Sequence, residues 1–363
     1  MPVALLATLT GCSGGGGDPA TEAETAFGPV KTYEEALACV REQLPGERYV
    51  TNAYLPGVEP PPPIPETPDA IRVGAPWILN DETAAWYVGM EKGFFRKQGI
   101  EMELIPGNID HVQSLAAGKV DIAIAATSTY PIRARASTTP VDLMIVATLL
   151  KTSPYTWMGI DESVPRDQPS SRRVTPQDMV GATVGIQVGY EFIARLLEGK
   201  HGLPAGSIEV MKAGPTPEPL LAGRVDYYAA WIVNQPRILE AQGYYNWTAF
   251  PLSEFGINDY ADASVFRRET VEARPDLVRR YLLGLEKAIR FMLENPRESA
   301  EITARYAVDA DLTPEQVMRR FELQRPLILT EDGLPLMGQD PARYDELAAT
   351  LHQYGQLDIT GCP

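Results

Sequence analysis

The 363-residue sequence contains very few cysteines, and their positions limit the chemistry of the protein. Only three are present, Cys12, Cys39 and Cys362, so none lies between residues 40 and 361. This absence excludes a zinc framework and a thiol nucleophile in the body of the chain. Cys39 and Cys362 could form one disulfide in an oxidising exterior, or they could remain two free thiols.

Long apolar runs and a positive charge balance are also missing. No stretch reaches the eighteen or so apolar residues that a membrane helix needs. Asp and Glu number 48 against 32 Lys and Arg, a formal net charge of −16 at pH 7. A nucleic-acid partner would require a basic patch, so we expect none. The histidines lack the spacing of metal ligands, which predicts no metal site: they are His111, His201 and His352.

Sequence motifs of catalysis and cofactor binding are absent as well. The chain has no Gly-rich phosphate loop, no HExxH and no nucleophile elbow. The adjacent carboxylates Asp81 and Glu82 could act as acid and base, but such neighbours on a loop are usually solvated. We therefore expect a protein that is not an enzyme and holds no cofactor.

The amino terminus has the pattern of an export signal. VALLATLTGC, from Val3 to Cys12, is a short apolar run that ends in Leu-Thr-Gly-Cys and resembles the lipobox of bacterial lipoproteins. The resemblance implies a signal over residues 1–12 and a lipid anchor at Cys12, although the usual basic residues before the run are missing. The alternative is an apolar start with one free thiol. The glycines Gly14–Gly17 are typical of a flexible tether.

A helix and a proline-rich stretch follow the glycines. TYEEALACVREQL, from Thr32 to Leu44, predicts a helix capped by Thr32, whereas Pro56–Asp69 is too rich in proline for a helix or a strand. We expect residues 13–69 to form a tether, a short helix and an extended linker. The folded body is predicted to begin near Ala70.

Within that body the chain contains a repeated pattern. LAAGKVDIA (Leu115–Ala123) and LLAGRVDYY (Leu220–Tyr228) both read as helix, glycine stop, turn and strand, and a shared turn without duplication would look the same. IRVGAPW (Ile71–Trp77) and ATVGIQVGY (Ala182–Tyr190) precede them as strands that end in glycine loops. Two tandem α/β units of this kind predict parallel sheets flanked by helices, with ligands beyond the carboxyl ends of the strands.

Several segments together carry a family resemblance. From Trp77 to Gly107 the chain has a Trp, an Asn three residues on, a small pair before a Tyr, and then a glycine, aromatic, glycine run. This stretch resembles the periplasmic substrate-binding proteins of ABC importers, in the branch for thiamine pyrimidine precursors, riboflavin, taurine and alkanesulfonates. The resemblance continues in order and spacing through LAAGKVDIA, Gly181–Ile193, Trp231–Tyr244 and Arg274–Ile302.

That family resemblance implies an α/β, two-lobed binding-protein fold of type II, in which each lobe is a mostly parallel sheet flanked by helices. Lobe 1 would comprise residues 70–152 plus 255–363, and lobe 2 residues 153–254, with a hinge between them. A small-molecule ligand would bind in the interlobe cleft of a monomer. Its partners would be an ABC permease and an ATPase outside the cytoplasm, at the cell envelope.

The resemblance also implies ligand contacts. The family's opening Trp, Asn and Tyr fall on Trp77, Asn80 and Tyr87, whereas Thr83 stands where pyrimidine binders tend to have His, which puts a thiamine precursor in doubt. For each aromatic, packing in a lobe core is the alternative. The predicted ligand-binding set is Trp77, Asn80, Asp81, Thr83, Tyr87, Ser128, Gln187, Tyr190, Glu191, Trp231, Asn234 and Asp262.

The loops in question are aromatic and acidic, with Lys92 as their one cation. Aromatic faces stack on flat rings and carboxylates accept from N–H groups, which favours a nitrogenous heteroaromatic such as riboflavin or a thiamine pyrimidine precursor. Helix amides could instead bind a small anion such as taurine, an alkanesulfonate or nitrate. A pyrimidine-synthesising enzyme of the same fold is a further alternative, but its cysteine-rich signature is absent. The loops also include Glu82, Trp86, Asp259 and Tyr260.

Overall fold

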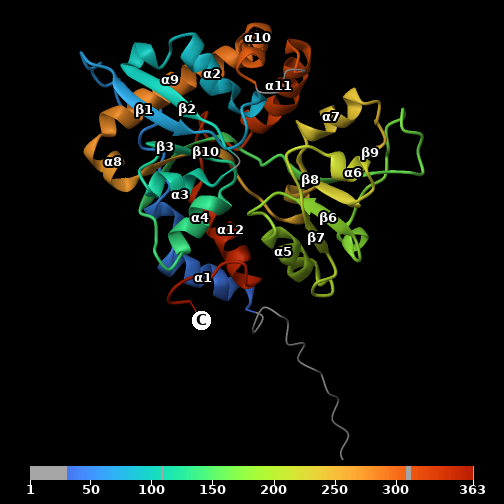
Figure 1. Ribbon diagram of the computed structural model, residues 1–363. Coiled ribbons are helices and arrows are strands. Elements are labelled where there is room, and N and C mark those ends of the chain that lie inside the picture. The colour runs from blue at the N-terminus through green and yellow to red at the C-terminus, as the bar shows by residue number, and fades with distance from the viewer. Residues whose placement is uncertain (1–30, 108, 308–311, 363) are drawn as a thin grey trace, which may run out of the picture.

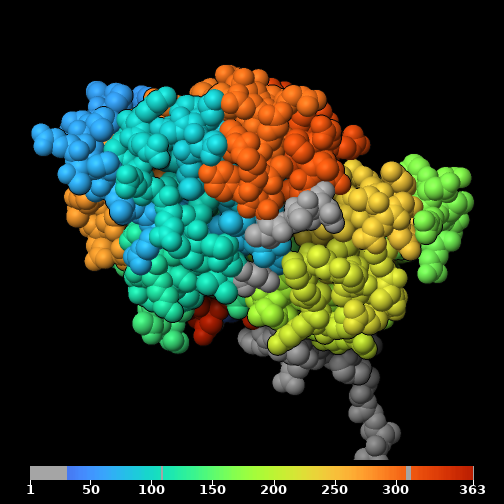
Figure 2. All heavy atoms as spheres, turned by 45° about the horizontal axis from the view of Figure 1, so that its top comes forward, coloured from blue at the N-terminus to red at the C-terminus, as the bar shows by residue number. Residues whose placement is uncertain are grey.

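The computed structural model describes residues 31–107, 109–307 and 312–362, and two lobes make up this part of the chain (Figure 1). Each lobe has one five-stranded sheet with helices packed around it. In the space-filling view the teal and orange surface of lobe 1 lies beside the yellow-green surface of lobe 2 (Figure 2). The lipobox, Cys12 and the glycine tether lie outside the described residues.

The sheet of lobe 1 has the strand order β2-β1-β3-β10-β4. β1 is parallel to β2 and β3, while β10 is antiparallel to both β3 and β4, so four of its five strands run in one direction. The expected mostly parallel sheet is therefore present, with one reversed strand. The strands are β1 (Asp69–Gly74), β2 (Ile100–Ile105), β3 (Ile122–Ala125), β4 (Leu143–Leu150) and β10 (Ala261–Arg267).

Helices from both ends of the chain surround this sheet. α9 covers it with a long buried stripe, and Tyr281 of α9 accepts a hydrogen bond from Trp86 Nε1 at 2.9 Å, which makes Trp86 a core residue. The helices are α1 (Tyr33–Gln43), α2 (Ala84–Glu91), α3 (His111–Ala116), α4 (Thr129–Ala136), α8 (Arg268–Ala273), α9 (Pro275–Glu294), α10 (Pro296–Tyr306), α11 (Pro314–Ile328) and α12 (Pro341–Gln353).

The sheet of lobe 2 has the order β7-β6-β8-β5-β9. β6 is parallel to β7 and β8, and β5 is antiparallel to β8 and β9, so this sheet also has a single reversed strand. Its elements are β5 (Tyr155–Ile160), β6 (Thr183–Ile186), α5 (Phe192–His201), β7 (Glu209–Lys212), α6 (Glu218–Leu221), β8 (Tyr227–Trp231), α7 (Gln235–Ala241) and β9 (Trp247–Pro251). Short 3-10 turns complete the chain: η1 (Gly46–Arg48), η2 (Asp81–Thr83), η3 (Arg96–Gln98), η4 (Pro176–Met179) and η5 (Leu252–Phe255).

The repeated sequence pattern corresponds to a repeated structure, one copy in each lobe. The first copy runs from α3 through Gly118 into β3, and the second from α6 through Gly223 into β8. Both glycines are left-handed, at φ 68° and 62°, a conformation that glycine adopts without a Cβ clash. The same glycine stop therefore reverses the chain between helix and strand in both lobes.

The chain crosses between the lobes twice, once from β4 to β5 and once from β9 to β10. The two crossings lie side by side, because the Ser153 N–H donates to the Asp259 carbonyl at 2.9 Å. The buried Lys151, at the start of the first crossing, forms an ion pair with the exposed Asp332. The hinge that the family resemblance implies would consist of these two connections.

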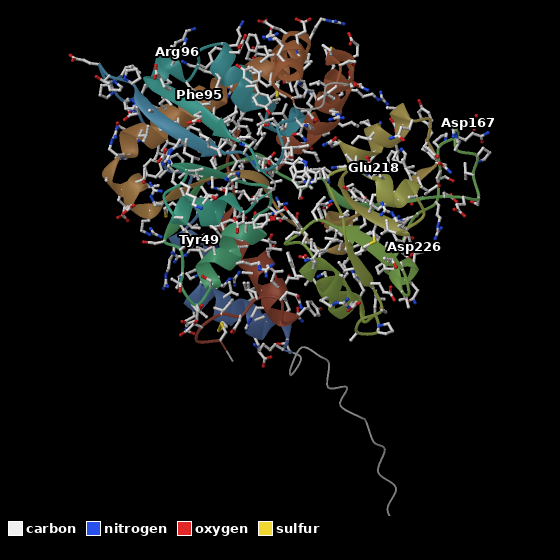
Figure 3. The ribbon with its side chains drawn as sticks, viewed as in Figure 1. Tyr49, Phe95, Arg96, Asp167, Glu218 and Asp226 are labelled. Carbon is white, nitrogen blue, oxygen red and sulfur yellow. A yellow bond between two sulfur atoms is a disulfide. The ribbon has the colours of Figure 1, made fainter. Side chains whose placement is uncertain are left out.

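The segment before β1 is part of the folded body, so the expectation that folding begins near Ala70 is corrected. Thr32 and Glu35 form a reciprocal cap on α1, and α1 packs on α12 through its buried Ala36 and Val40. Tyr49, labelled in Figure 3, is fully buried. The sequence did not indicate this contact, because the helix that covers the apolar face of α1 is α12, near the other end of the chain. The proline-rich stretch between α1 and β1 instead suggested a linker.

A disulfide joins the two ends of the described chain. Cys39 of α1 is bonded to Cys362, with their Cα atoms 5.7 Å apart. The bond spans 323 positions in sequence and lies beside α1 at the foot of lobe 1 (Figure 1). Among the described residues no helix is both long and apolar enough to cross a membrane.

Candidate ligand site between the two lobes

A cavity between the lobes lies at the carboxyl ends of the parallel strands of both sheets. Trp77 follows β1 and Ala126 follows β3, while Gln187 follows β6. Ligands of open α/β sheets bind at such edges because the loops there diverge and leave a crevice. The lining residues are Trp77, Glu82, Ala126, Tyr155, Gln187, Tyr190, Ala229, Ala230, Trp231, Asn234 and Gln235.

Four of the eleven lining residues are aromatic, and they come from both lobes. Tyr155 and Tyr190 of lobe 2 stack with ring centroids 5.2 Å apart, and Tyr130 of lobe 1 meets Tyr190 edge-on at 5.5 Å. Burial raises the pKa of both stacked tyrosines, Tyr155 and Tyr190, well above the usual value, so their hydroxyls stay neutral. Trp77 and Trp231 add two half-buried indoles from opposite lobes.

Two amides in the lobe 2 wall are held by hydrogen bonds. Gln187 Nε2 donates to Tyr228 Oη and to the Ala229 carbonyl, both at 3.0 Å. The Trp231 N–H donates to Gln235 Oε1 at 2.8 Å. These bonds fix the side chains against their strands, and the described lining contains no Lys, Arg or His.

The one carboxyl in the lining is Glu82 of η2, which is 8% exposed. Asn80 orients this turn, because its side-chain oxygen accepts from the Glu82 N–H at 3.0 Å. Burial raises the pKa of Glu82 well above its usual value, and the nearby carboxyls of Asp262 and Asp81 raise it further. Asp262, on β10, is 1% exposed and its pKa is raised by burial in the same way.

Asp81 has a different environment from that of its neighbour Glu82. Arg320 and Gln324 of α11 both donate to its carboxylate, the latter at 2.9 Å. The Asp81 and Arg320 side chains are 2% and 5% exposed, so this is a buried ion pair. It fastens the loop that carries Glu82 to a helix of the same lobe.

Five of the twelve sequence-predicted site residues line the cavity: Trp77, Gln187, Tyr190, Trp231 and Asn234. The other seven do not line it, and for several of them other groups occupy the polar atoms or rings. Thr83 donates to Tyr87 Oη at 2.6 Å, and the Tyr87 ring stacks on Tyr306 at 4.9 Å. The seven are Asn80, Asp81, Thr83, Tyr87, Ser128, Glu191 and Asp262.

Three lining residues with functional side chains were absent from the predicted set: Glu82, Tyr155 and Gln235. Glu82 stood among the acidic loop residues, and its position in η2 turns it toward lobe 2 while Asp81 turns to α11. Tyr155 follows the first hinge crossing directly, and that place in the chain could have indicated it. Gln235 begins α7 one residue after Asn234.

A second cavity lies on the other side of the tyrosine stack. Tyr155 and Tyr190 line both cavities, and Asp259 of the hinge lines only the second. Burial raises the pKa of Asp259 to about 7, against the opposing hydrogen bond from the Ser128 N–H at 2.9 Å. The tyrosine pair is therefore a partition within the interlobe region.

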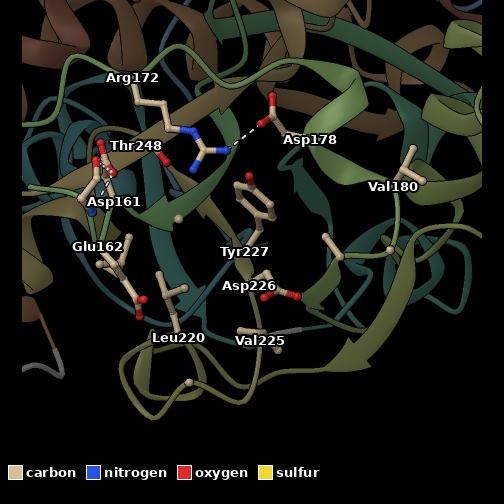
Figure 4. Close-up of a pocket in the computed structure, with 16 residues that line it drawn as sticks. Asp161, Glu162, Arg172, Asp178, Val180, Leu220, Val225, Asp226, Tyr227 and Thr248 are labelled. Carbon is tan, nitrogen blue, oxygen red and sulfur yellow. Dashed lines mark hydrogen bonds and ion pairs between the residues drawn. The ribbon is translucent and has the colours of Figure 1, made fainter.

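A larger hollow lies in lobe 2 alone, at the amino ends of β6 and β8 (Figure 4). Arg172 reaches over Tyr227 to Asp178, with 2.6 Å between the guanidinium and carboxylate atoms. Arg172 and Asp178 in its wall pair with each other, and its lining residues all come from lobe 2. The interlobe cavity is the better candidate because both lobes build it at the strand ends where ligands bind. In the described part of the chain, no three His, Cys, Asp or Glu side chains are grouped as metal ligands.

Comparisons with known proteins agree with this architecture. A family model described as NMT1/THI5 like matches residues 80–299. The formylaminopyrimidine-binding protein of Halalkalibacterium halodurans is 24% identical over 81% of this chain and 88% of its own length. The riboflavin-binding protein RibY of Chloroflexus aurantiacus is 24% identical over 78% of each chain. The periplasmic aliphatic sulphonate binding protein SsuA of Escherichia coli shares the fold, with a TM-score of 0.57 at 16% identity over 78% of this chain and 87% of that one.

Proposed function

The chain belongs to the NMT1/THI5-like family, and on that premise we propose that it is an extracytoplasmic substrate-binding protein of an ABC importer. Its ligand is a flat, nitrogen-containing heteroaromatic molecule that binds between the lobes. The protein delivers this ligand and does not transform it. The single observation that carries the proposal is the interlobe cavity with its aromatic walls and one carboxyl.

The geometry of that cavity supports capture of a ring. Trp77 and Trp231 come from opposite lobes, so a flat molecule between them contacts both lobes at once. Such contacts exist only when the lobes are close together, and a ligand that makes them favours the closed arrangement. The two hinge crossings permit this closure with few changes in backbone conformation.

The chemistry of the lining supports a nitrogenous ligand. Glu82 accepts hydrogen bonds from N–H groups, and the aromatic faces stack on π systems. Two relatives carry names that refer to such rings, formylaminopyrimidine and riboflavin. A sulfonate or nitrate would favour Arg, Lys or free backbone amides, and a buried carboxyl in the lining repels an anion.

The surrounding machinery belongs to the same proposal. We infer a permease and an ATPase as partners, a lipid anchor at Cys12 and a monomeric binding protein outside the cytoplasm. Cys12 lies outside the described residues, so its lipidation is tested chemically, by mass spectrometry of the membrane-bound protein. The disulfide between Cys39 and Cys362 is compatible with an oxidising exterior.

The test is a thermal-shift panel on the full chain, since α1 and the linker pack on lobe 1. The panel contains an aminopyrimidine, thiamine, riboflavin, taurine and nitrate at matched concentrations. A ligand at a hundred times its Kd stabilises the protein by about 2.7 kcal/mol, which raises the melting temperature measurably. A shift with a heteroaromatic supports the proposal, whereas a shift with taurine or nitrate alone contradicts the ligand class.

A further inference from the structure

Glu82 is a buried carboxyl that lies in the cavity wall with few partners of its own. It is about nine-tenths buried, and its side chain contacts the same space as Tyr190 and Trp231 of lobe 2. After burial itself, the neighbouring carboxyl of Asp262 has the largest effect in raising the pKa of Glu82. An unpaired carboxyl oxygen at this place is available to a ligand.

Asp262 lies next to Glu82 and has even fewer partners. It is 1% exposed, and neither of its carboxyl oxygens receives a hydrogen bond from an N–H or hydroxyl group of the described residues. Its backbone is left-handed at φ 54°, a conformation that is unfavourable for a residue other than glycine. Strain of this kind gathers at functional sites, where the surrounding structure holds it in place.

In the described part of the chain, the charged groups found to act on the two carboxyls are other carboxyls, and no cation is among them. Asp81 of η2 faces both, but its own charge is balanced by Arg320 and Gln324 of α11. Burial raises the pKa of Tyr87 of α2 and of Tyr190 of lobe 2, and the nearby carboxyl of Glu82 raises the pKa of both tyrosines further. Burial and a neighbouring like charge both disfavour the ionisation of the second carboxyl, so we expect one proton to stay on the pair.

We propose that Glu82 and Asp262 hold one proton between them, and that the Glu82 oxygen facing the cavity accepts a hydrogen bond from an amino or N–H group of the ligand. This inference rests on the proposed function and specifies its substrate class. The pair carries one negative charge in total, so the recognised edge of the ligand is a donor, either neutral or cationic. A ligand that presents only hydrogen-bond acceptors to Glu82 leaves the buried Glu82 oxygen without a donor, and such a ligand binds more weakly.

Two pyrimidines that differ in one substituent test the recognition step. The probes are 4-amino-2-methylpyrimidine, a donor, and 4-methoxy-2-methylpyrimidine, which only accepts. We expect the wild-type protein to bind the amino compound about 10- to 100-fold more tightly, the range for a hydrogen bond to a charged group. Glu82→Leu removes this preference. Glu82→Gln keeps it, because the Gln amide donates to Asp262 in place of the shared proton and turns its carbonyl to the cavity.

A matched control is Glu218→Gln, a change at an exposed residue of α6 that does not line the cavity (labelled in Figure 3). This variant keeps the wild-type preference for the amino probe. If the preference persists unchanged in Glu82→Leu, the inference is overturned, while binding of either pyrimidine leaves the proposed function standing. If neither pyrimidine binds to the wild-type protein, the recognition step fails, and the thermal-shift panel with riboflavin and thiamine decides separately on the ligand class.

The shared proton is tested without any ligand. An infrared spectrum of the unliganded protein at pH 7 contains the band of a protonated carboxyl, which disappears in Glu82→Gln and in Asp262→Asn. Asp259 contributes its own band, so the decisive quantity is the difference between variant and wild type. A spectrum that is the same in all three proteins overturns the inference whatever the pyrimidines do.

Discussion

Asp121 and Asp226 hold equivalent positions in two different sheets. Each carboxylate accepts a hydrogen bond from a backbone N–H of the neighbouring strand, that of Arg72 at 2.9 Å and that of Thr183 at 2.8 Å. Each Asp returns its own N–H to the carbonyl of the same residue. The Val-Asp of the repeated sequence pattern therefore joins the glycine turn to the adjacent strand in both lobes.

Replacing either aspartate by Ala should destabilise its lobe. We expect Asp121→Ala to lower the free energy of unfolding by about 2 kcal/mol and Asp226→Ala by about 1 kcal/mol, because only Asp121 also pairs with the guanidinium of Arg72. Urea denaturation measures both, and their effects should add, since the sites lie in separate lobes. Equal stability of all variants would show that the turn alone sets the register.

Glu82→Gln should stabilise the protein in a way that depends on pH. The pKa of Glu82 is raised in the folded state, so folding binds a proton that the unfolded chain releases as the pH rises above about 4.5. The Glu82 carboxyl therefore lowers the stability of the fold increasingly as the pH rises toward its raised pKa. At pH 8 the free energy of unfolding of the variant should therefore exceed that of the wild-type protein by about 1.4 kcal/mol for each unit of pKa shift. This difference in stability should become smaller as the pH falls toward about 4. A gap that stays constant with pH would contradict the raised pKa.

Trp77→Ala should remove ligand affinity without unfolding the protein. The indole is half-buried at the cavity, so we expect the Kd to rise at least about tenfold, while the melting temperature of the unliganded protein changes little. Trp86→Phe is the comparison, because Trp86 is a core residue bonded to Tyr281 and its loss should lower the melting temperature. Calorimetry and thermal melts separate the two effects.

The buried pair of Asp81 and Arg320 should be costly to break from one side. Arg320→Met leaves an uncompensated carboxylate beside Glu82, and we expect a loss of about 3 to 5 kcal/mol. The double variant with Asp81→Leu should recover most of it, because no charge then remains buried alone. A double-mutant cycle by chemical denaturation gives the coupling energy. If Arg320→Met and the double variant lose the same free energy of unfolding, the packing around the Arg320 side chain, and not its charge, stabilises this region.

Removing the disulfide should affect stability and leave ligand binding unchanged. Cys39→Ser with Cys362→Ser should cost about 2 to 5 kcal/mol, the range for native disulfides that close long loops. The bond lies at the foot of lobe 1, away from the cavity residues. A changed Kd in the variant would therefore indicate that α1 influences the cleft.

Much of the fold was predictable because its signals are local. Thr32 and Glu35 lie three residues apart and cap α1 as their spacing predicts. Gly118 and Gly223 each follow the end of a helix by two residues, in the positions that the repeated pattern predicts. The docking of α1 on α12 was not predictable, because a buried helix face does not reveal which distant helix covers it.

The site was predictable in part for the same reason. Trp77, Gln187 and Trp231 end strands or follow them, and strand ends of parallel sheets point to a common edge. Asp81 and Tyr87 lie equally close in sequence to that edge, but residues more than 200 positions away bind them. Those partners belong to α10 and α11, and the sequence around η2 does not indicate which distant helices will contact it.

The hydrogen bond between Ser153 and Asp259 constrains how the lobes can move. Because this bond ties the two crossings together, any change in the separation of the lobes acts on both crossings at the same place. A single distance measured across the mouth of the cleft is then enough to distinguish a closed arrangement from an open one.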